Sequence, residues 1–469
     1  MKPEADNTRR NQASPNGNAE LTWMAKAYRR TLAFYLNRLI PENSRVLQIG
    51  CGDAYLLSLL KTQNVTGIDA SSEKLMRAAQ RLPEATFLHG DAAAITIPGT
   101  FDYILISDAL NTAPDVQRLL EHLMANASTT TRLIITYHNN VWLPLFGIAK
   151  WLGLRKEEAP SSWLSTADVN NFLKLAGWLT IRNESRILWP FKTPVLSFVL
   201  NRLLAPVLPF LNLACITIAR SNRPDTPDRV NPSVSIVIPA RNEAGNIHHA
   251  IERIPDMGSF TEYIFVEGNS TDNTWEEVQK LPVLHPDKKI KVLKQSGKGK
   301  GNAVREGFDQ ATGDILMILD ADLTMPPEEL PKFYHAIATG RAEFANGSRL
   351  VYPMEDKAMQ FFNMVANKSF GIIFSWLLGQ PIKDTLCGTK VLSRQNYLTI
   401  AANRSFFGDF DPFGDFDLLF GAGKLNLQIL DIPIRYKERT YGSTNIQRWR
   451  HGVLLLRMVL FAARKLKFI

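Results

Sequence analysis

Short apolar runs alternate with amphipathic segments along nearly the whole chain. Each run has the length of a buried strand, and the helical spacing of apolar residues between the runs predicts helices. Ser165, with Asp168 three residues on, predicts the start of one of these helices. Alternating strands and helices are typical of a parallel sheet covered by helices, so we expect two α/β domains. The strands are expected at residues 45–49, 65–69, 86–89, 103–107, 132–137, 179–188, 214–219, 234–238, 263–266, 291–293, 314–319 and 343–346.

The boundaries of these domains follow from composition. Residues 221–233 are rich in Pro, Asp, Asn and Ser and predict an exposed linker. Residues 1–18 are polar and are expected to be disordered. The first domain should then span residues 19–220 and the second 234–446, followed by a basic amphipathic helix at 447–469. We find no internal repeat.

Composition and charge narrow the classes of function. Hydrophobic residues make up 45% of the 469 residues and charged residues 21%, as in a folded globular protein. The net charge of +9 fits phosphate-rich ligands or an anionic membrane. We expect no nucleic-acid partner, since zinc-finger spacing and RNA-reading aromatic motifs are absent. Three distant cysteines and an N-terminus without an apolar core predict a cytoplasmic protein, with peripheral contact to the inner face of the membrane as one option.

The first domain carries a glycine turn after its first strand. Gly50 and Gly52 flank Cys51 where a strand passes into a helix, and glycines there let the backbone approach a ligand. Asp69 ends the next strand, where a ribose diol is bound, and Asp91 follows the third, near an adenine amino group. Because Tyr55 stands where a dinucleotide fingerprint has a small residue, S-adenosylmethionine is the favoured cofactor over a nicotinamide.

Over about residues 20–220 these motifs resemble the class I S-adenosylmethionine-dependent methyltransferases. Residues 101–108 look like the fourth-strand motif of that family. Gln48 replaces the acid that the family usually has in its first strand, which removes a charge facing the methionine amine. The resemblance implies a Rossmann-like fold and a cofactor site made of Gln48, Gly50, Cys51, Gly52, Asp69, Asp91 and Asp108. Two alternatives stay open: a domain that binds the cofactor without catalysis or has a regulatory or membrane-docking role, and a fold that kept the turn for packing alone.

The second domain carries paired acids at the end of a buried run. Asp320, Ala321 and Asp322 follow the strand at 314–319, and paired carboxylates there predict a divalent cation site that holds a diphosphate. An ordinary turn capped by Asp is the competing interpretation. Two earlier strands also exit into polar loops, at residues 239–243 and 267–274, where a base and ribose are expected to bind.

Several spaced motifs make residues 232–446 similar to the inverting family 2 glycosyltransferases, and most to the dolichyl-phosphate mannose synthase group. The resemblance implies a GT-A fold, a UDP- or GDP-sugar donor, a polyprenyl phosphate or cell-envelope glycan acceptor, and Mg²⁺ or Mn²⁺ on Asp320 and Asp322. It places Asp384 and Gly388 on the acceptor side. Gly268 replaces the second acid of the nucleotide turn, which leaves the base open. The implied nucleotide-sugar site consists of Pro239, Arg241, Glu243, Glu267, Lys300, Asp320, Ala321, Asp322, Arg349 and Arg439.

An acidic cluster precedes the last helices of this domain. Inversion by a sugar hydroxyl needs a general base, and Asp417 is the candidate from a cluster that includes Asp409, Asp411 and Asp415. A polyprenyl phosphate is already ionised and needs no such base. A nucleotidyltransferase that uses the same metal pair is a further alternative. We therefore expect a bifunctional enzyme in which Asp322 and Asp417 are catalytic.

The end of the chain has the pattern of an interfacial helix. Trp449, Val453, Leu456, Leu460 and Ala463 share one helical stripe, and Arg450, Arg457 and Arg464 repeat every seven residues. Such a helix either lies in a membrane interface or packs on its own domain. Residues 370–378 and 187–213 are two further apolar tracts that could hold a lipid chain.

Overall fold

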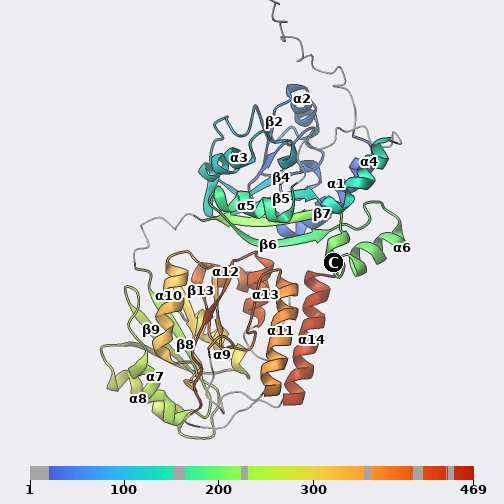
Figure 1. The fold of residues 1–469 in the computed structure, drawn as a ribbon. Coiled ribbons are helices and arrows are strands. Elements are labelled where there is room, and N and C mark those ends of the chain that lie inside the picture. The colour runs from blue at the N-terminus through green and yellow to red at the C-terminus, as the bar shows by residue number, and fades with distance from the viewer. Residues whose placement is uncertain are drawn as a thin grey trace, which may run out of the picture.

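The computed structural model describes residues 21–151, 164–222, 231–352, 361–404, 416–439, 441 and 448–469. They form two α/β domains stacked one on the other (Figure 1). The predicted disordered segment at residues 1–18 and most of the predicted linker lie outside the described residues. Among the described helices, none is both long and apolar enough to cross a membrane.

The N-terminal domain is built on a seven-stranded sheet in the order β3-β2-β1-β4-β5-β7-β6. Strands β1 to β5 pair in parallel, whereas β7 runs antiparallel to both β5 and β6. The strands are β1 (Val46–Ile49), β2 (Val65–Asp69), β3 (Thr86–His89), β4 (Phe101–Ser107), β5 (Ala127–His138), β6 (Trp178–Arg186) and β7 (Ala214–Ser221). The helices are α1 (Trp23–Leu39), α2 (Ser72–Arg81), α3 (Val116–Leu123), α4 (Leu143–Trp151), α5 (Thr166–Leu175) and α6 (Pro194–Ser197), which a π-helix, η5 (Phe198–Leu204), continues.

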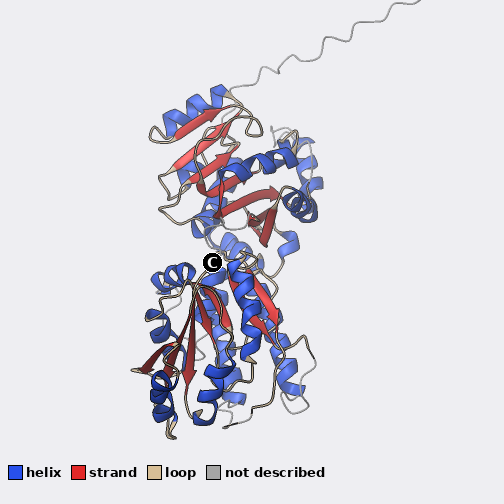
Figure 2. Cartoon of the chain, turned by 90° about the vertical axis from the view of Figure 1, so that its left-hand side faces the viewer, coloured by secondary structure: helices blue, strands red, loops and turns tan. Residues whose placement is uncertain are grey.

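The C-terminal domain also has a seven-stranded sheet, in the order β10-β9-β8-β11-β13-β12-β14. Figure 2 shows the strands of both domains in red among blue helices. Strand β13 is antiparallel to both of its neighbours. The strands are β8 (Val234–Ala240), β9 (Thr261–Glu267), β10 (Lys289–Lys294), β11 (Ile315–Ile318), β12 (Phe344–Ser348), β13 (Lys390–Ser393) and β14 (Ile429–Pro433). The helices are α7 (Ile247–Arg253), α8 (Thr274–Leu284), α9 (Lys300–Asp309), α10 (Leu330–Ala338), α11 (Phe361–Leu378), α12 (Arg394–Ala402), α13 (Phe416–Lys424) and α14 (Arg448–Leu466).

The predicted α/β architecture is confirmed, with one correction to the sheets. Both sheets are mixed rather than parallel, because β7 runs antiparallel to β5 and β6 in the first sheet and β13 runs antiparallel to β11 and β12 inside the second. The short strands β13 and β14 were not predicted. Helix α5 begins as expected, since Ser165 and Asp168 form a reciprocal capping box. The parallel strands β1, β8 and β11 are apolar and almost wholly buried, because helices cover both faces of each sheet.

The two domains meet through strands β5 to β7 of one and, in the other, the end of α14 and the residues just before β12 and β14. The Arg186 Nη1 atom donates to the Lys467 carbonyl oxygen at 2.8 Å, and Arg132 Nη2 pairs with Glu343 Oε1 at 2.7 Å. Arg220 Nε donates to Gln428 Oε1 at 2.6 Å. Each of these basic side chains crosses from the first sheet to the second domain.

A buried charge cluster lies at the centre of this interface. Glu184 is within 3.6 Å of Lys467 Nζ from α14's end, and it also pairs with Arg182 at 3.3 Å and Arg186 at 3.2 Å. Burial acts to raise the pKa of Glu184, but the three cations hold it well below the usual range. The carboxylate is thus the only anion in this cluster of described residues.

Glu184→Gln is expected to lower the free energy of unfolding by about 3 kcal/mol, because it leaves buried cations without their counter-ion. Since the pKa of Glu184 is depressed in the folded state, its contribution is complete at neutral pH. The contribution fades as acid protonates the carboxylate, so the difference should shrink below about pH 4. Thermal unfolding at several pH values measures this. The exposed i,i+4 pair of Glu73 and Arg77 supplies the control Glu73→Gln, which should change little.

Candidate functional site

The paired acids of the second domain lie at the carboxyl end of β11, and each faces a basic side chain. Lys300 Nζ is 2.6 Å from Asp320 Oδ1, and Arg439 Nη2 is 2.6 Å from Asp322 Oδ2. The Thr324 amide and hydroxyl donate to Asp322 Oδ1 at 3.1 and 2.9 Å. The sequence predicted that these four charged side chains belong to one site, and the structure brings them together.

Arg439 links the acid pair to the loop after β8. Its Nη1 atom is 2.9 Å from Glu243 Oε1, so one guanidinium bridges Glu243 and Asp322. The segment that carries it runs beside the acid loop, because the Lys437 amide donates to the Thr324 carbonyl oxygen at 2.9 Å. Burial raises the pKa of Glu243, although Arg439 opposes the shift.

Gly388 closes the site from the side of β13. A Cβ atom on this residue would overlap Asp320 Oδ2 and Lys300 Nζ. With a Cβ atom there, the Lys300 ammonium and the Asp320 carboxylate would have to shift from their pairing. The prediction that Gly388 belongs to the acceptor side stays a prediction.

The residues present fit a divalent cation that a phosphate group helps to hold. Asp320 and Asp322 offer the oxygen ligands that Mg²⁺ and Mn²⁺ bind, and the loop sits at a strand end where diphosphates bind. In the described ranges no three His, Cys, Asp or Glu side chains gather as a metal cage. Further ligands would therefore come from the diphosphate and water. In this structure Lys300 and Arg439 neutralise the two carboxylates, whose charge a bound cation would otherwise neutralise.

The loops after β8 and β9 form one hydrogen-bonded unit. Asn242 has a φ of +58°. Its side-chain Oδ1 atom accepts the Thr271 backbone amide at 2.8 Å, and its backbone amide donates to Ser270 Oγ at 3.0 Å. Asp272 caps Thr274 at the start of α8. The site prediction omitted Asn242 and Asp272, although the sequence Ser-Thr-Asp after β9 was a signal for this turn.

The remaining predicted nucleotide-sugar residues lie in or beside these loops. Arg241 is exposed and Pro239 is partly buried, whereas Ala321 is buried. Glu267 is also buried, and it accepts the Ser270 amide. A contact between any of them and a donor stays a prediction.

Arg349 and Asp384 form a buried bidentate pair. Arg349 Nε and Nη2 lie 2.7 and 2.8 Å from the two Asp384 oxygens, and Asn367 donates to the same carboxylate at 3.0 Å. Burial opposes ionisation of Asp384, but Arg349 lowers its pKa to about 2. The sequence placed Arg349 at a phosphate and Asp384 at the acceptor. In this structure they face each other, and both roles stay predictions.

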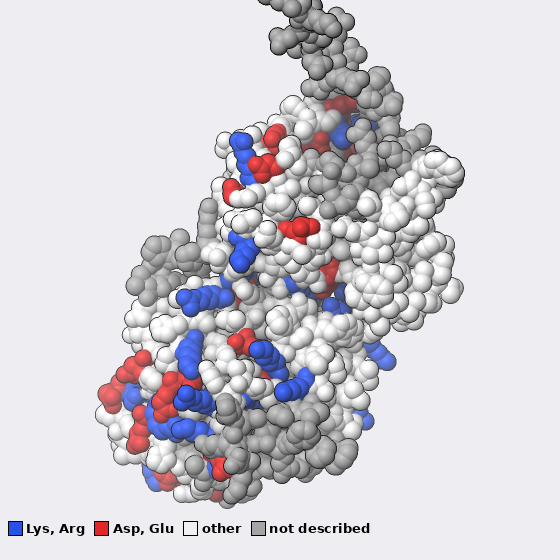
Figure 3. Space-filling model, in the orientation of Figure 1, with Lys and Arg blue, Asp and Glu red and all other residues white. Residues whose placement is uncertain are grey.

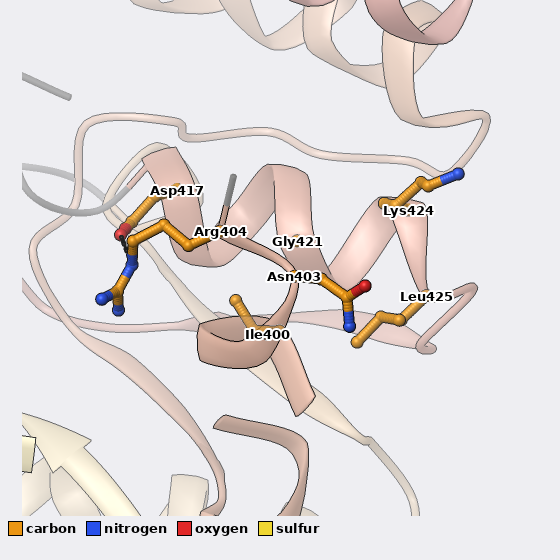
Figure 4. A pocket seen from close by; sticks show the side chains of 7 residues that line it. All are labelled: Ile400, Asn403, Arg404, Asp417, Gly421, Lys424 and Leu425. Carbon is orange, nitrogen blue, oxygen red and sulfur yellow. Dashed lines mark ion pairs between the residues drawn. The ribbon is translucent and has the colours of Figure 1, made fainter. Parts of the chain in front are cut away.

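Asp417 lies at the start of α13, and Figure 4 shows Arg404 beside it. Its Oδ2 atom is 3.6 Å from Arg305 Nη1 and 3.7 Å from Arg404 Nε. Arg305 stands on α9, the helix that Lys300 begins, so α9 connects Asp417 to the acid pair. Asp417 also lines a small pocket between α12 and α13. Its predicted cluster partners Asp409, Asp411 and Asp415 lie outside the described residues.

The glycine turn of the first domain has the conformation that a nucleoside site requires. Gly50 and Gly52 have φ of +66° and +59°, and a Cβ on Gly50 would lie 2.6 Å from Ala109 Cβ. Asp69 Oδ2 accepts the Gly52 amide at 2.8 Å and thereby joins the ends of β1 and β2. Asp91 accepts the Ala93 amide at 2.9 Å in an exposed loop.

Two buried side chains of β1 and its turn differ in what they offer a ligand. Gln48 is buried, and its Oε1 atom has no hydrogen-bond donor among the described residues. A ligand amine would satisfy this acceptor, so the site fits S-adenosylmethionine. Cys51 is buried too. This burial, and to a smaller extent the negative charge of Asp69, raises the pKa of the Cys51 thiol to about 12.

The next strand ends supply a cluster of polar and aromatic groups. Asp108, at φ +53° after β4, lies 3.5 Å from His138 Nδ1 and accepts the Tyr28 hydroxyl at 3.4 Å. The rings of Tyr28 and His138 stack at 5.2 Å. Burial, and then Asp108, raise the pKa of Tyr28 well above its usual value. Tyr28 was not predicted, because it lies in α1, far from any motif.

Two family models match the chain. Residues 235–396 match Glycosyl transferase family 2, and residues 40–177 match a methyltransferase domain. The chain is therefore an enzyme that carries both domains, as the resemblances implied.

The relatives match the second domain. A dolichol-phosphate mannosyltransferase of Pyrococcus furiosus is 35% identical over 46% of this chain and 59% of its own length. An undecaprenyl-phosphate 4-deoxy-4-formamido-L-arabinose transferase of Edwardsiella ictaluri is 32% identical over 45% of this chain and 62% of its own length. The chain thus spans less than two thirds of either relative. A solved glucosyl-3-phosphoglycerate synthase of Mycobacterium tuberculosis aligns at 18% identity with a TM-score of 0.37, over 51% of this chain and 81% of that protein.

Gly388→Ala is expected to weaken Mn²⁺ binding in the presence of UDP or GDP at least tenfold, because its methyl group would displace Asp320. Calorimetric titration of Mn²⁺ into the full chain with excess nucleotide measures this affinity. Gly452→Ala is the matched control, since nothing lies within 4 Å of a Cβ there. Equal affinities for the two variants would remove Gly388 from the site.

Proposed function

We propose that this enzyme, which carries a methyltransferase domain ahead of a family 2 glycosyltransferase domain, transfers a sugar from a UDP- or GDP-sugar to a polyprenyl phosphate with inversion. The first domain transfers a methyl group from S-adenosylmethionine. The observation that carries the proposal is the meeting of Asp320, Asp322, Lys300 and Arg439 at one strand end.

Sugar transfer requires stabilisation of the departing nucleoside diphosphate. A divalent cation held by Asp320 and Asp322 supplies charge neutralisation to that leaving group. Lys300 and Arg439, which pair with these acids in the structure, would contact the phosphates of the donor. Arg439 also holds Glu243, so the loop after β8 is fixed together with the phosphate site.

The surroundings of Asp417 favour a phosphate acceptor over a hydroxyl. A general base must accept a proton, whereas Asp417 is buried between Arg305 and Arg404. An ionised phosphate attacks without such a base. The names of the Pyrococcus and Edwardsiella relatives also specify dolichol phosphate and undecaprenyl phosphate.

In the first domain the chain offers a proton acceptor near the cofactor site. Ala109, next to Asp108, packs against Gly50, so Asp108 and His138 lie beside the glycine turn. Asp108 and the ring of Tyr28 orient His138. His138 can therefore accept the proton of an acceptor hydroxyl as the methyl group is transferred.

A screen of UDP- and GDP-sugars with undecaprenyl phosphate tests the sugar transfer. We expect release of a nucleoside diphosphate that EDTA abolishes and Mn²⁺ restores, and Asp322→Asn should reduce it at least 100-fold. The exposed Asp287→Asn is the control. Asp417→Asn should retain activity with undecaprenyl phosphate, because an ionised phosphate acceptor needs no general base. Release of inorganic diphosphate instead would establish a nucleotidyltransferase.

Gln48→Leu tests cofactor binding through two measurements with opposite outcomes. Removing the unsatisfied amide oxygen should leave the thermal midpoint of the free protein unchanged or higher, because an unsatisfied buried acceptor is costly. The same change should weaken S-adenosylmethionine binding about tenfold by calorimetry, since the ligand amine loses its acceptor. Gln117→Leu, at a partly exposed position of α3, should change neither. Absence of binding to the wild-type chain would exclude methyl transfer, and binding without transfer would favour the silent domain.

A further inference from the structure

Helix α14 presents two different apolar faces. Leu455, Met458 and Ala462 are buried in the core of the second domain. Val453, Leu456 and Leu460 are about half exposed and form a second stripe on the outer side. The sequence alternatives of an interfacial helix and a packed helix are thus combined in one element. Ala463, predicted on the outer stripe, is buried, and the side chains of Trp449 and Arg450 are not among those described.

Exposed apolar side chains continue from α14 onto the first domain. On α11, Ile372 is 73% exposed. Segment 194–211 and helix α4 extend the surface, with Val195 at 78% and Trp151 at 84% exposure. We call these exposed residues the apolar face; it consists of Val141, Leu143, Leu145, Ile148, Trp151, Val195, Leu196, Phe198, Val199, Leu203, Leu204, Val207, Phe210, Ile372, Trp376, Val453, Leu456 and Leu460.

Direct contacts join the four segments of this face. Trp142 Nε1, beside α4, donates to the Leu211 carbonyl oxygen at 2.9 Å. Trp376 Nε1 of α11 donates to the Pro206 carbonyl oxygen at 3.1 Å, which crosses from one domain to the other. Arg202 Nε donates to the carbonyl oxygen of Phe468, just after α14, at 3.0 Å. The elements α4, α6, α11 and α14 accordingly lie along one side of the molecule (Figure 1).

The charges of the face have one sign. Segments 139–151, 187–213, 361–378 and 448–466 contain no Asp or Glu in the sequence. They contain basic residues, among them Arg202 and the exposed Arg457 and Arg464 of α14. In Figure 3 the right-hand side of the upper domain is almost entirely white where it is not grey, so it shows almost no Lys, Arg, Asp or Glu. An apolar surface of this extent with basic residues only is complementary to an anionic lipid interface.

We propose that both domains dock together on an anionic bilayer through the apolar face. The leucines of α14 and the apolar residues of segment 194–211 enter the acyl boundary, and arginines contact lipid phosphates. Because the buried interface holds the domains together, one bilayer serves both catalytic sites. This goes beyond the proposed reactions and holds for any sugar donor.

Co-sedimentation of the full chain with vesicles tests the proposal. Wild-type protein should bind vesicles of phosphatidylcholine and phosphatidylglycerol in equal parts, and binding should fall at least tenfold on pure phosphatidylcholine or at high salt. Leu456→Glu with Leu460→Glu, and separately Val195→Glu with Val207→Glu, should each reduce binding at least tenfold. Val283→Glu with Leu284→Glu is the matched control on α8, where Val283 is 81% exposed outside the face.

The outcomes discriminate between occupants of the face. Thermal midpoints confirm that each variant is folded. The two double variants lie in different domains, so if one does not fold, the other still tests the proposal. Unchanged binding in a folded pair overturns docking by that domain. A wild-type dimer by sedimentation velocity that these pairs convert to monomer, without vesicle binding, would instead assign the face to a second copy. Hydrolysis of nucleotide sugars in solution tests the proposed sugar transfer separately, so its outcome does not depend on whether the chain binds vesicles.

Discussion

The arrangement of the two domains depends on buried charge pairs at their interface. Glu184 lies among Arg182, Arg186 and Lys467 and supplies the counter-charge of these buried cations, and Glu343 of the second domain pairs with Arg132. Lys467 and the carbonyl oxygens around it belong to the end of α14, so the same contacts seat that helix against the first sheet. These contacts and the hydrogen bonds of Trp376 to Pro206 and Arg202 to Phe468 place α4, α6, α11 and α14 along one side of the molecule.

The ion pairs at the site of the second domain are more exposed than those at the domain interface. Asp320 and Asp322 face Lys300 and Arg439 across water-accessible loops, where each pair is partly exposed. Partly exposed pairs are weak, so the proposed cation and diphosphate would replace them at small cost. Arg349 and Asp384 are paired nearby but are buried. Exchange of this buried pair for a ligand would therefore cost more than exchange of the exposed pairs.

Sequence patterns predicted the buried parallel strands and the residues at their carboxyl ends. Strands β2 and β3 have the predicted bounds, because their apolar runs end abruptly at polar turns. The antiparallel strand β13 was missed since Lys390–Ser393 is short and begins with a lysine that is buried. Nor could spacing reveal Tyr28 beside His138, because that contact joins α1 to the end of β5 across the fold. Motifs report local geometry, whereas such contacts depend on tertiary packing.

The same limit explains why the pattern of the last helix supported two interpretations. A helix with one apolar stripe can pack against only one partner, either its own domain or a membrane. The sequence of α14 was interpreted from one such stripe. Its apolar residues in fact cover two sides, because Leu455 and Met458 pack inward while Leu456 and Leu460 face out. The inward side fixes the helix to the protein and needs no lipid to be stable. The outer side is then held rigidly in line with the exposed residues of the first domain, so its orientation is set before any membrane is met.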